Sequence, residues 1–211
     1  MSTELDEAPR LCELAKTLGE RGWLPATSGN LSVIVTADPL TFAVTRSGAD
    51  KSRLTPADLL TVDADARVLR KASHDFRPSA EACVHAQIYT KLQSGAVLHV
   101  HTLANNLCSD LFAQAGAMIV TGHELLKALD HWEKEATIAI PIVPNHHDLQ
   151  ELAAAVGDAA SASVPGVLVR NHGIYAWGDS LESAFRHLEA FEFLFAYEVM
   201  RRTLTPQSLS W

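Results

Sequence analysis

Apolar residues recur along the chain with two spacings, one typical of helices and one typical of strands. Near the start, Leu11, Leu14 and Leu18 recur every three or four residues, which predicts a helix with one buried stripe that closes at Gly19 and Gly22. Short runs of apolar and β-branched residues between turn residues predict strands instead. The predicted strands cover residues 31–35, 41–45, 60–62, 67–70, 96–100, 117–120, 137–143, 167–170 and 173–177.

Capping residues and prolines locate the other helices. These are expected to begin near Ser79, Ala104, Glu124, Leu149 and Leu181. Asp179, followed three residues later by Glu182, predicts a capping box for the last helix, and Pro141 places the strand over 137–143 at an edge or a bulge. Many short strands joined by hairpins and covered by helices indicate an α/β fold, a three-layer α/β/α sandwich with a central, largely antiparallel sheet. Since no repeat or linker interrupts the pattern, we expect one domain over residues 1–211.

The last predicted helix is apolar on more than one side. One stripe consists of Leu181, Phe185, Leu188, Phe191 and Phe195. Phe193, Leu194 and Tyr197 lie outside this stripe and leave little polar surface. A helix of this kind is buried between layers or covered by another subunit.

Composition narrows the class of protein. The chain is 47% apolar and 20% charged, as is usual for soluble globular proteins, and its net charge of −8 argues against a nucleic-acid partner. No apolar run is long enough for a membrane span, and the acidic start, Met1 to Glu7, does not resemble a signal peptide. The three scattered cysteines fit a reducing compartment, so we expect a cytoplasmic protein.

Two histidines at strand spacing are the first candidates for chemistry. His99 and His101 are two residues apart in an otherwise apolar segment, so both imidazoles point to the same side of a strand, as a divalent metal site requires. The alternative is a strand end where both rings meet solvent or hydrogen bonds. His172 lies in a turn between two apolar strands and could be the third ligand, although a histidine that caps the turn would look the same.

Three loops rich in small residues could hold an anion. They are Ala26-Thr-Ser-Gly-Asn-Leu-Ser32, Thr45-Arg-Ser-Gly-Ala-Asp-Lys51 and Arg77-Pro-Ser-Ala80. Small hydroxyl residues and glycines offer side-chain and backbone donors, and the third loop opens a predicted helix, whose free N–H groups attract anions. Each loop alone could be an ordinary solvated turn, but together they indicate a phosphate pocket.

Two glutamates lie at predicted helix starts. Glu81 and Glu124 could each simply compensate a helix dipole. Glu81 could also be aimed at a metal or substrate. His85, four residues later on the same helix face, is interpreted as a structural residue, and His187 as a packing or hydrogen-bonding histidine.

Five of these segments, taken in order, resemble the class II aldolase/adducin family. They are Thr27-Ser-Gly-Asn-Leu-Ser32, Ser47-Gly48, Pro78-Ser-Ala-Glu81, Gly95-Ala-Val-Leu-His-Val-His101 and Asn171-His-Gly-Ile-Tyr-Ala-Trp-Gly178. Each motif is weak alone, but their order and spacing over about residues 10–200 are specific. Further segments, among them His123-Glu-Leu-Leu-Lys-Ala-Leu129, resemble the dehydratases of the family most.

The resemblance implies a role for each candidate residue. It implies one Zn²⁺ per subunit on His99, His101 and His172. The phosphate of a sugar-phosphate substrate would lie against Thr27, Gly29, Asn30, Ser47, Gly48 and Ser79. In the sugar aldolases the glutamate matching Glu81 ligates the free metal or serves as acid/base, whereas in the dehydratases the acid/base matches Glu124. Ala80 departs from the aldolase pattern, which often has a second serine there.

The resemblance also implies an enzyme that removes water from a sugar phosphate, without a redox cofactor, as a four-fold homotetramer with active sites near subunit contacts. An aldolase or an epimerase of the same family would use the same metal site, so the sequence separates these activities poorly. A third alternative is an adducin-like interaction module without catalysis. Such modules need not keep the metal ligands, and all three histidines are present in this chain.

Overall fold

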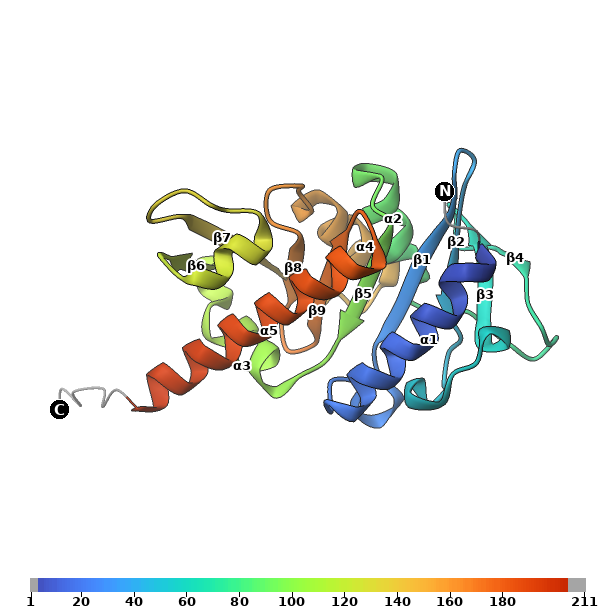
Figure 1. Cartoon of the computed structure of the whole chain (residues 1–211), viewed down its shortest axis with the longest axis horizontal. Helices are drawn as coiled ribbons and strands as arrows, with labels where there is room; N and C mark the ends of the chain where they lie inside the picture. The colour runs from blue at the N-terminus through green and yellow to red at the C-terminus, as the bar shows by residue number, and fades with distance from the viewer. Residues whose placement is uncertain (1–3, 205–211) are drawn as a thin grey trace.

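Nine strands form one sheet in the order β4-β3-β2-β1-β5-β9-β8-β7-β6 (Figure 1). The computed structural model describes residues 4–204; Met1, Ser2 and Thr3 of the acidic start lie outside the described residues. The strands are β1 (Asn30–Ala37), β2 (Leu40–Thr45), β3 (Leu59–Asp63), β4 (Val68–Arg70), β5 (Ala96–Val100), β6 (Ala117–Thr121), β7 (Thr137–Val143), β8 (Gly166–Val169) and β9 (Gly173–Gly178). Only the β7–β8 pair is parallel among these strands, so the predicted largely antiparallel sheet is confirmed.

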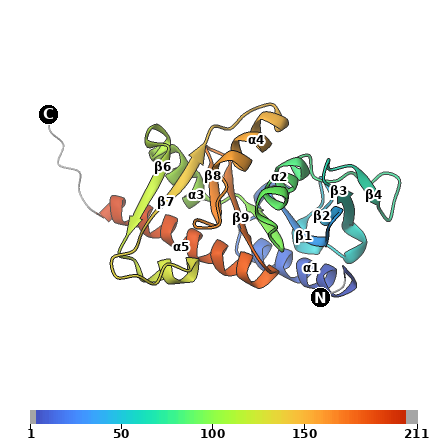
Figure 2. The ribbon, with the colours of Figure 1, turned by 90° about the horizontal axis from the view of Figure 1, so that it is seen from above.

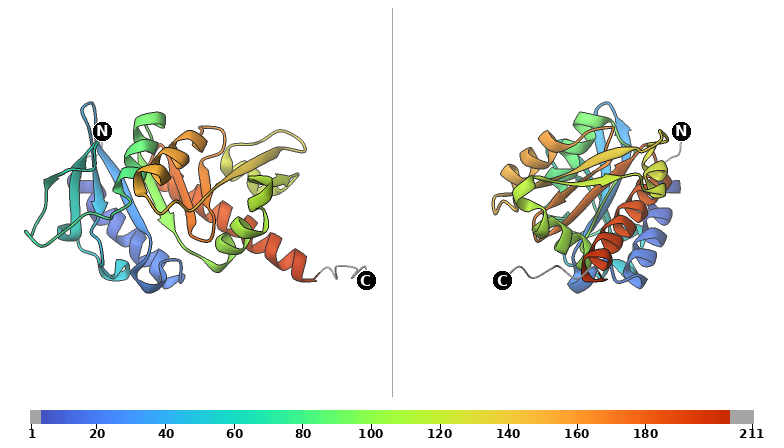
Figure 3. Two further views of the ribbon diagram at one scale, coloured as in Figure 1. Left: turned by 180° about the vertical axis from the view of Figure 1, so that it is seen from behind. Right: turned by 90° about the vertical axis from the view of Figure 1, so that its left-hand side faces the viewer.

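Helices cover both faces of the sheet, which confirms the predicted three layers (Figures 2 and 3). The helices are α1 (Glu4–Glu20), α2 (Ala82–Leu92), α3 (Leu103–Leu111), α4 (Leu149–Ala159) and α5 (Leu181–Leu204). Short 3-10 turns connect the elements: η1 (Pro25–Thr27), η2 (Lys51–Arg53), η3 (Pro56–Asp58), η4 (Ala113–Ala115) and η5 (Glu124–Leu129). Helices α1, α3 and α5 contribute to the apolar core on one face, and α2 and α4 to the core on the other. None of the helices within residues 4–204 is long and apolar enough to cross a membrane.

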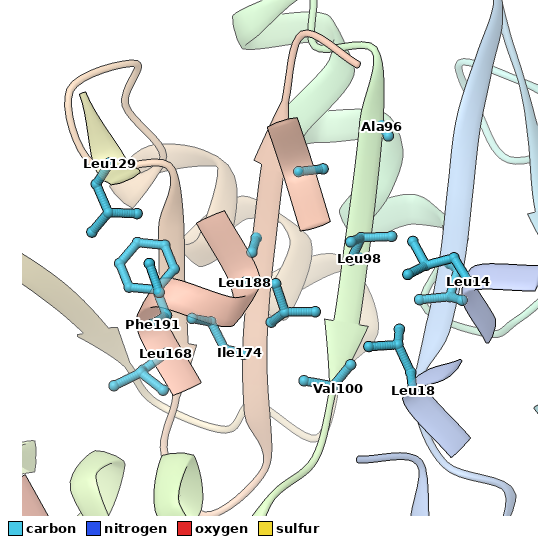
Figure 4. Packing of buried hydrophobic residues seen from close by; sticks show 14 of the residues in the cluster. Leu14, Leu18, Ala96, Leu98, Val100, Leu129, Leu168, Ile174, Leu188 and Phe191 are labelled. Atoms are coloured by element: carbon cyan, nitrogen blue, oxygen red, sulfur yellow. The ribbon is translucent and has the colours of Figure 1, made fainter. Parts of the chain in front are cut away.

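Successive side chains of β5 point to opposite faces of the sheet, and this determines which face carries His99. Leu98 and Val100 pack with the α1 and α5 side chains, as Figure 4 shows. Val97 belongs to the opposite core, with α2 and α4. Because strand residues two apart share a face, His99 points with Val97 toward the α2–α4 layer. The sheet therefore keeps the histidine side apart from the α1–α5 core.

Helix α2 begins three residues later than the sequence predicts. Its first residue is Ala82 rather than Ser79, and Glu81 is the N-cap residue rather than part of the first turn. Pro78 instead forms a bridge with Arg46, and the Ser79 N–H donates to the Thr45 carbonyl oxygen at 3.2 Å. This short extended segment delays the helix and leaves the Glu81 side chain free to turn away from it.

The cap of α5 also differs from the prediction. Ser180 and Ser183 form the reciprocal pair, since each backbone N–H donates to the other residue's Oγ, at 2.9 and 3.2 Å. Asp179 and Glu182 do not form the expected box; Glu182 pairs with Arg10 of α1 instead. A serine closer to the helix start satisfies the free N–H groups as well as an aspartate would.

Pro141 predicts an edge or a bulge, but β7 lies between β6 and β8, so it is not the edge strand of the sheet. Residues Thr137 to Pro141 pair with β6, whereas Ile142 and Val143 pair with β8. Pro141 lies where the strand changes partners, and the missing N–H interrupts neither ladder there.

A buried carboxyl group joins α5 to the segment that follows the histidine strand. Glu192 accepts hydrogen bonds from the Thr102 hydroxyl at 2.6 Å and from the Asn105 amide at 2.7 Å. Thr102 is the N-cap of α3 and follows His101 directly. Burial raises the pKa of Glu192 to about 7, against the opposing effect of these two hydrogen bonds.

We predict that Glu192 makes folding stability depend on pH. The unfolded chain ionises this carboxyl near pH 4.5 and the folded chain near pH 7. Unfolding therefore releases a proton in this window, and the stability that the neutral form contributes falls as the pH rises through it. Glu192→Gln should gain free energy of unfolding relative to wild type between pH 5 and 7, up to the order of 3 kcal/mol. Urea unfolding from pH 5 to 8 measures this, with Glu189→Gln as control; Glu189 lies on the same helix, is partly exposed and is paired with Arg21. Parallel pH curves for wild type and Glu192→Gln would contradict the prediction.

Candidate metal and catalytic site

Three histidine rings meet where β5 ends beside the β8–β9 turn. His99 lies in β5, His101 follows the last β5 residue, and His172 lies in the turn that enters β9. The antiparallel pairing of Val100 with Ile174 brings the turn to the strand end. One ring nitrogen from each histidine lies within 4.8 Å of the other two, and the ring centroids are 4.7–5.0 Å apart. The predicted convergence of the three rings is confirmed.

The chemistry of these nitrogens fits a bound cation. His99 Nδ1 lies 2.9 Å from the Ile174 carbonyl oxygen, which can only accept, so Nδ1 carries the proton and Nε2 presents a lone pair. That lone pair faces His101 Nε2 at 2.8 Å. Burial lowers the pKa of His99 to about 4 and that of His101 to about 3, so both rings are neutral ligands at pH 7. A divalent ion held by three neutral imidazoles keeps a coordination position open for substrate.

Glu81 completes the cluster from the N-terminal end of α2. Its Oε1 lies 3.0 Å from His172 Nε2 and its Oε2 lies 3.5 Å from His99 Nε2. Burial raises the pKa of this carboxyl, but hydrogen bonds from His172 and Asn30 outweigh burial and hold the pKa well below its usual range. The carboxylate is therefore ionised and directed at the histidines, and it can ligate a cation there or exchange a proton with a substrate.

Two neighbouring strands support His99 from either side. In the sheet register, Asn30 of β1 and Tyr175 of β9 lie opposite His99. The Tyr175 ring stacks on the His99 ring, with centroids 4.0 Å apart and an interplanar angle of 10°. The spacing of residues within one segment could not reveal this support, because it depends on the pairing of three strands.

The Asn30 side chain is already engaged on both sides. Its Nδ2 donates to Glu81 Oε2 at 2.5 Å, and its Oδ1 lies 2.5 Å from His85 Nε2. Of the residues expected at a phosphate, Asn30 is thus the one whose side chain is directed to the Glu81 carboxylate.

The three loops expected at a phosphate do come together. The Ser47 N–H donates to the Arg77 carbonyl oxygen at 2.9 Å, which joins the Ser47–Gly48 loop to the segment that carries Ser79. Lys51 joins the same loop to Thr27, because its Nζ donates to the Thr27 and Ala49 carbonyl oxygens at 2.7 and 3.1 Å. The clustering of these loops is confirmed, while their ligand stays a prediction.

Gly29 and Gly48 both have a positive φ but different surroundings. A Cβ on Gly29 would lie 2.7 Å from the His99 carbonyl oxygen and 2.4 Å from the Leu24 side chain, so the loop packs directly on the histidine strand. A Cβ on Gly48 would meet nothing within 4 Å. Gly29 is therefore explained by packing, and Gly48 is the position with open space beside its backbone.

Lys51 is a candidate that the sequence pattern placed at a solvated turn. Its side chain is 4% exposed and lies between the first two loops. Burial lowers the pKa of this ammonium group, and Arg46 adds to the effect. Two of its N–H groups reach carbonyl oxygens and the third is left for another acceptor. Ser28 Oγ, in the adjoining loop, is buried without a hydrogen-bond partner within residues 4–204.

Glu124 does not join the histidine cluster of its own chain. Its side chain is 78% exposed at the start of η5, and it pairs with Lys127 at 2.8 Å. The ring of the preceding His123 lies against Phe193 and Tyr197 of α5, with centroids 5.7 and 5.2 Å away. The structure thus places Glu124 beside α5 rather than among the histidines.

Comparison with known proteins gives one consistent result. The family described as "Class II Aldolase and Adducin N-terminal domain" matches residues 9–199. Methylthioribulose-1-phosphate dehydratase of Persephonella marina is 47% identical over 187 residues, 89% of this chain and 86% of the relative. The same-named protein of Geobacillus kaustophilus is 44% identical over 99% of both chains. The crystal structure of L-fuculose-1-phosphate aldolase from Thermus thermophilus has a TM-score of 0.69 at 24% identity, over 92% of this chain and 93% of that one, and supports the fold.

We predict that the histidine cluster binds one divalent metal ion per chain. His99→Ala and His101→Ala should each lose most of the bound metal, because two imidazoles hold an ion much more weakly than three. Metal content per chain, measured by inductively coupled plasma mass spectrometry after dialysis, tests this. His147→Ala, which removes an exposed histidine outside the cluster, should keep the wild-type content. Stoichiometric metal in the His99→Ala/His101→Ala double variant would exclude this site.

Proposed function

The chain belongs to the class II aldolase and adducin family, and from this membership and its histidine cluster we infer that it is a dehydratase of 5-methylthioribulose 1-phosphate. The reaction removes water and yields 2,3-diketo-5-methylthiopentyl 1-phosphate, a step of methionine salvage. The observation that carries this inference is the match of 44% identity over 99% of both chains to a relative with this activity in its name. The three intact histidines argue against a non-catalytic adducin-like module.

We assign the cation as zinc, one per subunit, held by His99, His101 and His172. Neutral imidazole is a preferred zinc ligand, and three of them with one open position are the usual catalytic arrangement. When bound, the ion supplies Lewis acidity that makes the proton beside the substrate carbonyl easier to remove. Tyr175 holds the His99 ring by stacking, and the Ile174 carbonyl oxygen fixes its tautomer, so these two residues orient one ligand before substrate arrives.

The substrate phosphate is proposed to lie against the three loops. Ser47, Gly48, Ser79 and Thr27 offer hydroxyl and backbone N–H donors, and Lys51 adds a buried positive charge with a donor still free. A phosphate dianion would satisfy that charge more fully than the carbonyl oxygens do. Anchoring the phosphate fixes the reacting carbons relative to the histidines and the acid/base.

Glu124 is proposed as the acid/base. It removes the proton from C3 and returns it to the hydroxyl that leaves C4, so one water departs and the resulting enol rearranges to the diketone. Because Glu124 is exposed and lies outside the cluster of its own chain, it would act on the site of a neighbouring subunit. Glu81 is proposed to ligate the free cation and, with substrate bound, to act as a secondary catalytic carboxylate beside the histidines.

A homotetramer is proposed on the apolar surface around α5. Exposed apolar side chains line α3 and α5: Leu103, Leu107, Leu111, Phe193, Tyr197, Met200 and Leu204. We call this the α3–α5 apolar face; Leu103 of α3 and Phe193 of α5 line the same hollow. A patch of this kind usually marks an interface. His123 lies against Phe193 and Tyr197, so a subunit that covers this face also meets Glu124.

The product of the reaction tests the function directly. The purified, zinc-loaded enzyme is incubated with 5-methylthioribulose 1-phosphate, and the products are identified by mass spectrometry and ³¹P NMR. Dehydration yields one phosphorylated diketone, 18 Da lighter than the substrate. Release of dihydroxyacetone phosphate instead would identify an aldolase, and an isomer of unchanged mass would identify an epimerase.

We predict that Lys51→Met raises KM for the phosphorylated substrate by roughly tenfold or more and lowers kcat less, as expected for lost uniform binding. Inorganic phosphate should also inhibit this variant more weakly than wild type. Lys91→Met is a matched control, because Lys91, in the last turn of α2, also donates to two backbone carbonyl oxygens, those of Gly157 and Asp158 in α4. If Lys51→Met and Lys91→Met have the same KM, Lys51 only anchors loops.

We predict that Glu124→Gln keeps its metal and loses about 10²–10⁴-fold in kcat, the usual contribution of an acid/base group. Mixing it with the equally inactive His99→Ala variant, with exchange of subunits, should restore activity. In mixed tetramers roughly a quarter of the sites combine an intact histidine cluster with an intact Glu124 of a neighbour. Steady-state rates of the mixture against each variant alone measure this.

Two outcomes would contradict these roles. No recovery after verified exchange would place Glu124 in its own chain's site. A Glu81→Gln variant that alone abolishes turnover would reverse the roles of Glu81 and Glu124.

A further inference from the structure

A row of buried side chains runs from Glu81 into the core below the site. Glu81 Oε2 is bonded to Asn30 Nδ2 at 2.5 Å, and Asn30 Oδ1 to His85 Nε2 at 2.5 Å. His85 Nδ1 is bonded to Ser32 Oγ at 2.6 Å, and Ser32 Oγ to the Tyr89 hydroxyl at 2.8 Å. His85, Ser32 and Tyr89 are at most 1% exposed. We call these five residues the Glu81 chain.

The Glu81 chain exists because a helix and a strand have matching repeats. Glu81, His85 and Tyr89 are four residues apart on α2, a rise of about 6 Å per step. Asn30 and Ser32 are two residues apart on one face of β1, a rise of about 6.6 Å. The two sets of side chains therefore interleave, one residue from the strand between each pair from the helix.

The hydrogen bond at one end sets the order of the protons along the chain. The Asn30 amide nitrogen donates to Glu81 Oε2, so the Asn30 oxygen faces His85 Nε2. His85 Nε2 must then carry a proton. Burial lowers the pKa of His85 to about 4, so the ring is neutral and its Nδ1 accepts from the Ser32 hydroxyl. Ser32 in turn accepts from Tyr89, whose oxygen also faces the backbone N–H of Val97.

We propose that His85 is a positioning residue, which acts through Asn30 to hold the Glu81 carboxylate in the one orientation that serves the reaction. This inference rests on the proposed function. With Oε2 tied to Asn30, Oε1 is left to face His172 at 3.0 Å. A neutral ring with its proton on Nε2 excludes the flipped Asn30 amide, because the flip would set two donors against each other. The sequence predicts a structural histidine here, and this proposal adds that its ring positions Glu81.

Neutron diffraction from crystals of the perdeuterated, metal-loaded enzyme tests the proton order without any substrate. The inference requires deuterium on His85 Nε2 and on Asn30 Nδ2 facing Glu81, with none on His85 Nδ1. Deuterium on Nδ1 would mean that the chain runs the other way, and would overturn the inference.

Kinetics of His85 variants test the positioning itself. His85→Leu removes the donor to Asn30 and should lower kcat about 10- to 100-fold, with a smaller change in KM and unchanged metal content. His85→Gln can still donate to Asn30 from its amide and should recover most of kcat. His187→Gln is the control, since His187 is equally a buried histidine, bonded to the Trp177 carbonyl oxygen away from the site, and its loss should change thermal stability but not kcat.

The outcomes separate this inference from the proposed function. Wild-type kcat in His85→Leu, or equal losses in His85→Leu and His85→Gln, would overturn the positioning role. If His85→Leu fails to fold, the deuterium positions decide alone. If the wild-type enzyme does not dehydrate methylthioribulose 1-phosphate, the proposed function fails, and the deuterium positions still support or overturn the order of the Glu81 chain.

Discussion

The register of three central strands fixes the position of His99 and of the side chains that support it. Pairing of β1 and β9 with β5 sets Asn30 and Tyr175 on either side of His99, all facing the α2–α4 layer. A slip of one residue would turn His99 into the α1–α5 core and break the interleaving with α2. Gly173 helps to hold this register, because any side chain there would collide with the Val100 carbonyl oxygen and the His99 ring.

Sequence reasoning recovered what local periodicity determines. The alternation over 96–101 predicts that His99 and His101 share a side, and the turn between two apolar strands predicts where His172 lies, because both follow from the repeat of a strand. The contact of Glu81 with those rings depends instead on where α2 begins. That point is set by the bridge between Pro78 and Arg46, a pairing between distant segments which no local pattern encodes. The burial of Lys51 likewise depends on a distant segment, because its ammonium group donates to the Thr27 carbonyl oxygen in another loop. The residues around Lys51 alone could not predict it.

The two sides of the sheet carry different groups of residues. The α2–α4 face carries the histidines and the polar side chains that hold them. On the opposite side of the sheet lie α3 and α5, which present the α3–α5 apolar face. There Glu192 joins α5 to the start of α3 through two hydrogen bonds. The segment around His101 joins the two sides. The His101 N–H donates to the Trp23 carbonyl oxygen at 3.0 Å, and the next residue, Thr102, donates to Glu192 of α5 at 2.6 Å. His101 is therefore tied through its backbone to the side of the sheet that carries α1 and α5.

The three histidines are buried to different degrees, and this determines from which side a metal ion or a substrate can reach them. His99 is fully buried, with Tyr175 and the Glu81 chain behind it, while His101 and His172 are only partly covered. An ion held by the three rings would meet solvent on the side of His101 and His172, and a substrate that binds it would approach from that same side. A bound substrate would then cover the ion, and a chelator would compete with substrate for the same approach. Occupancy by substrate should therefore slow the loss of the ion.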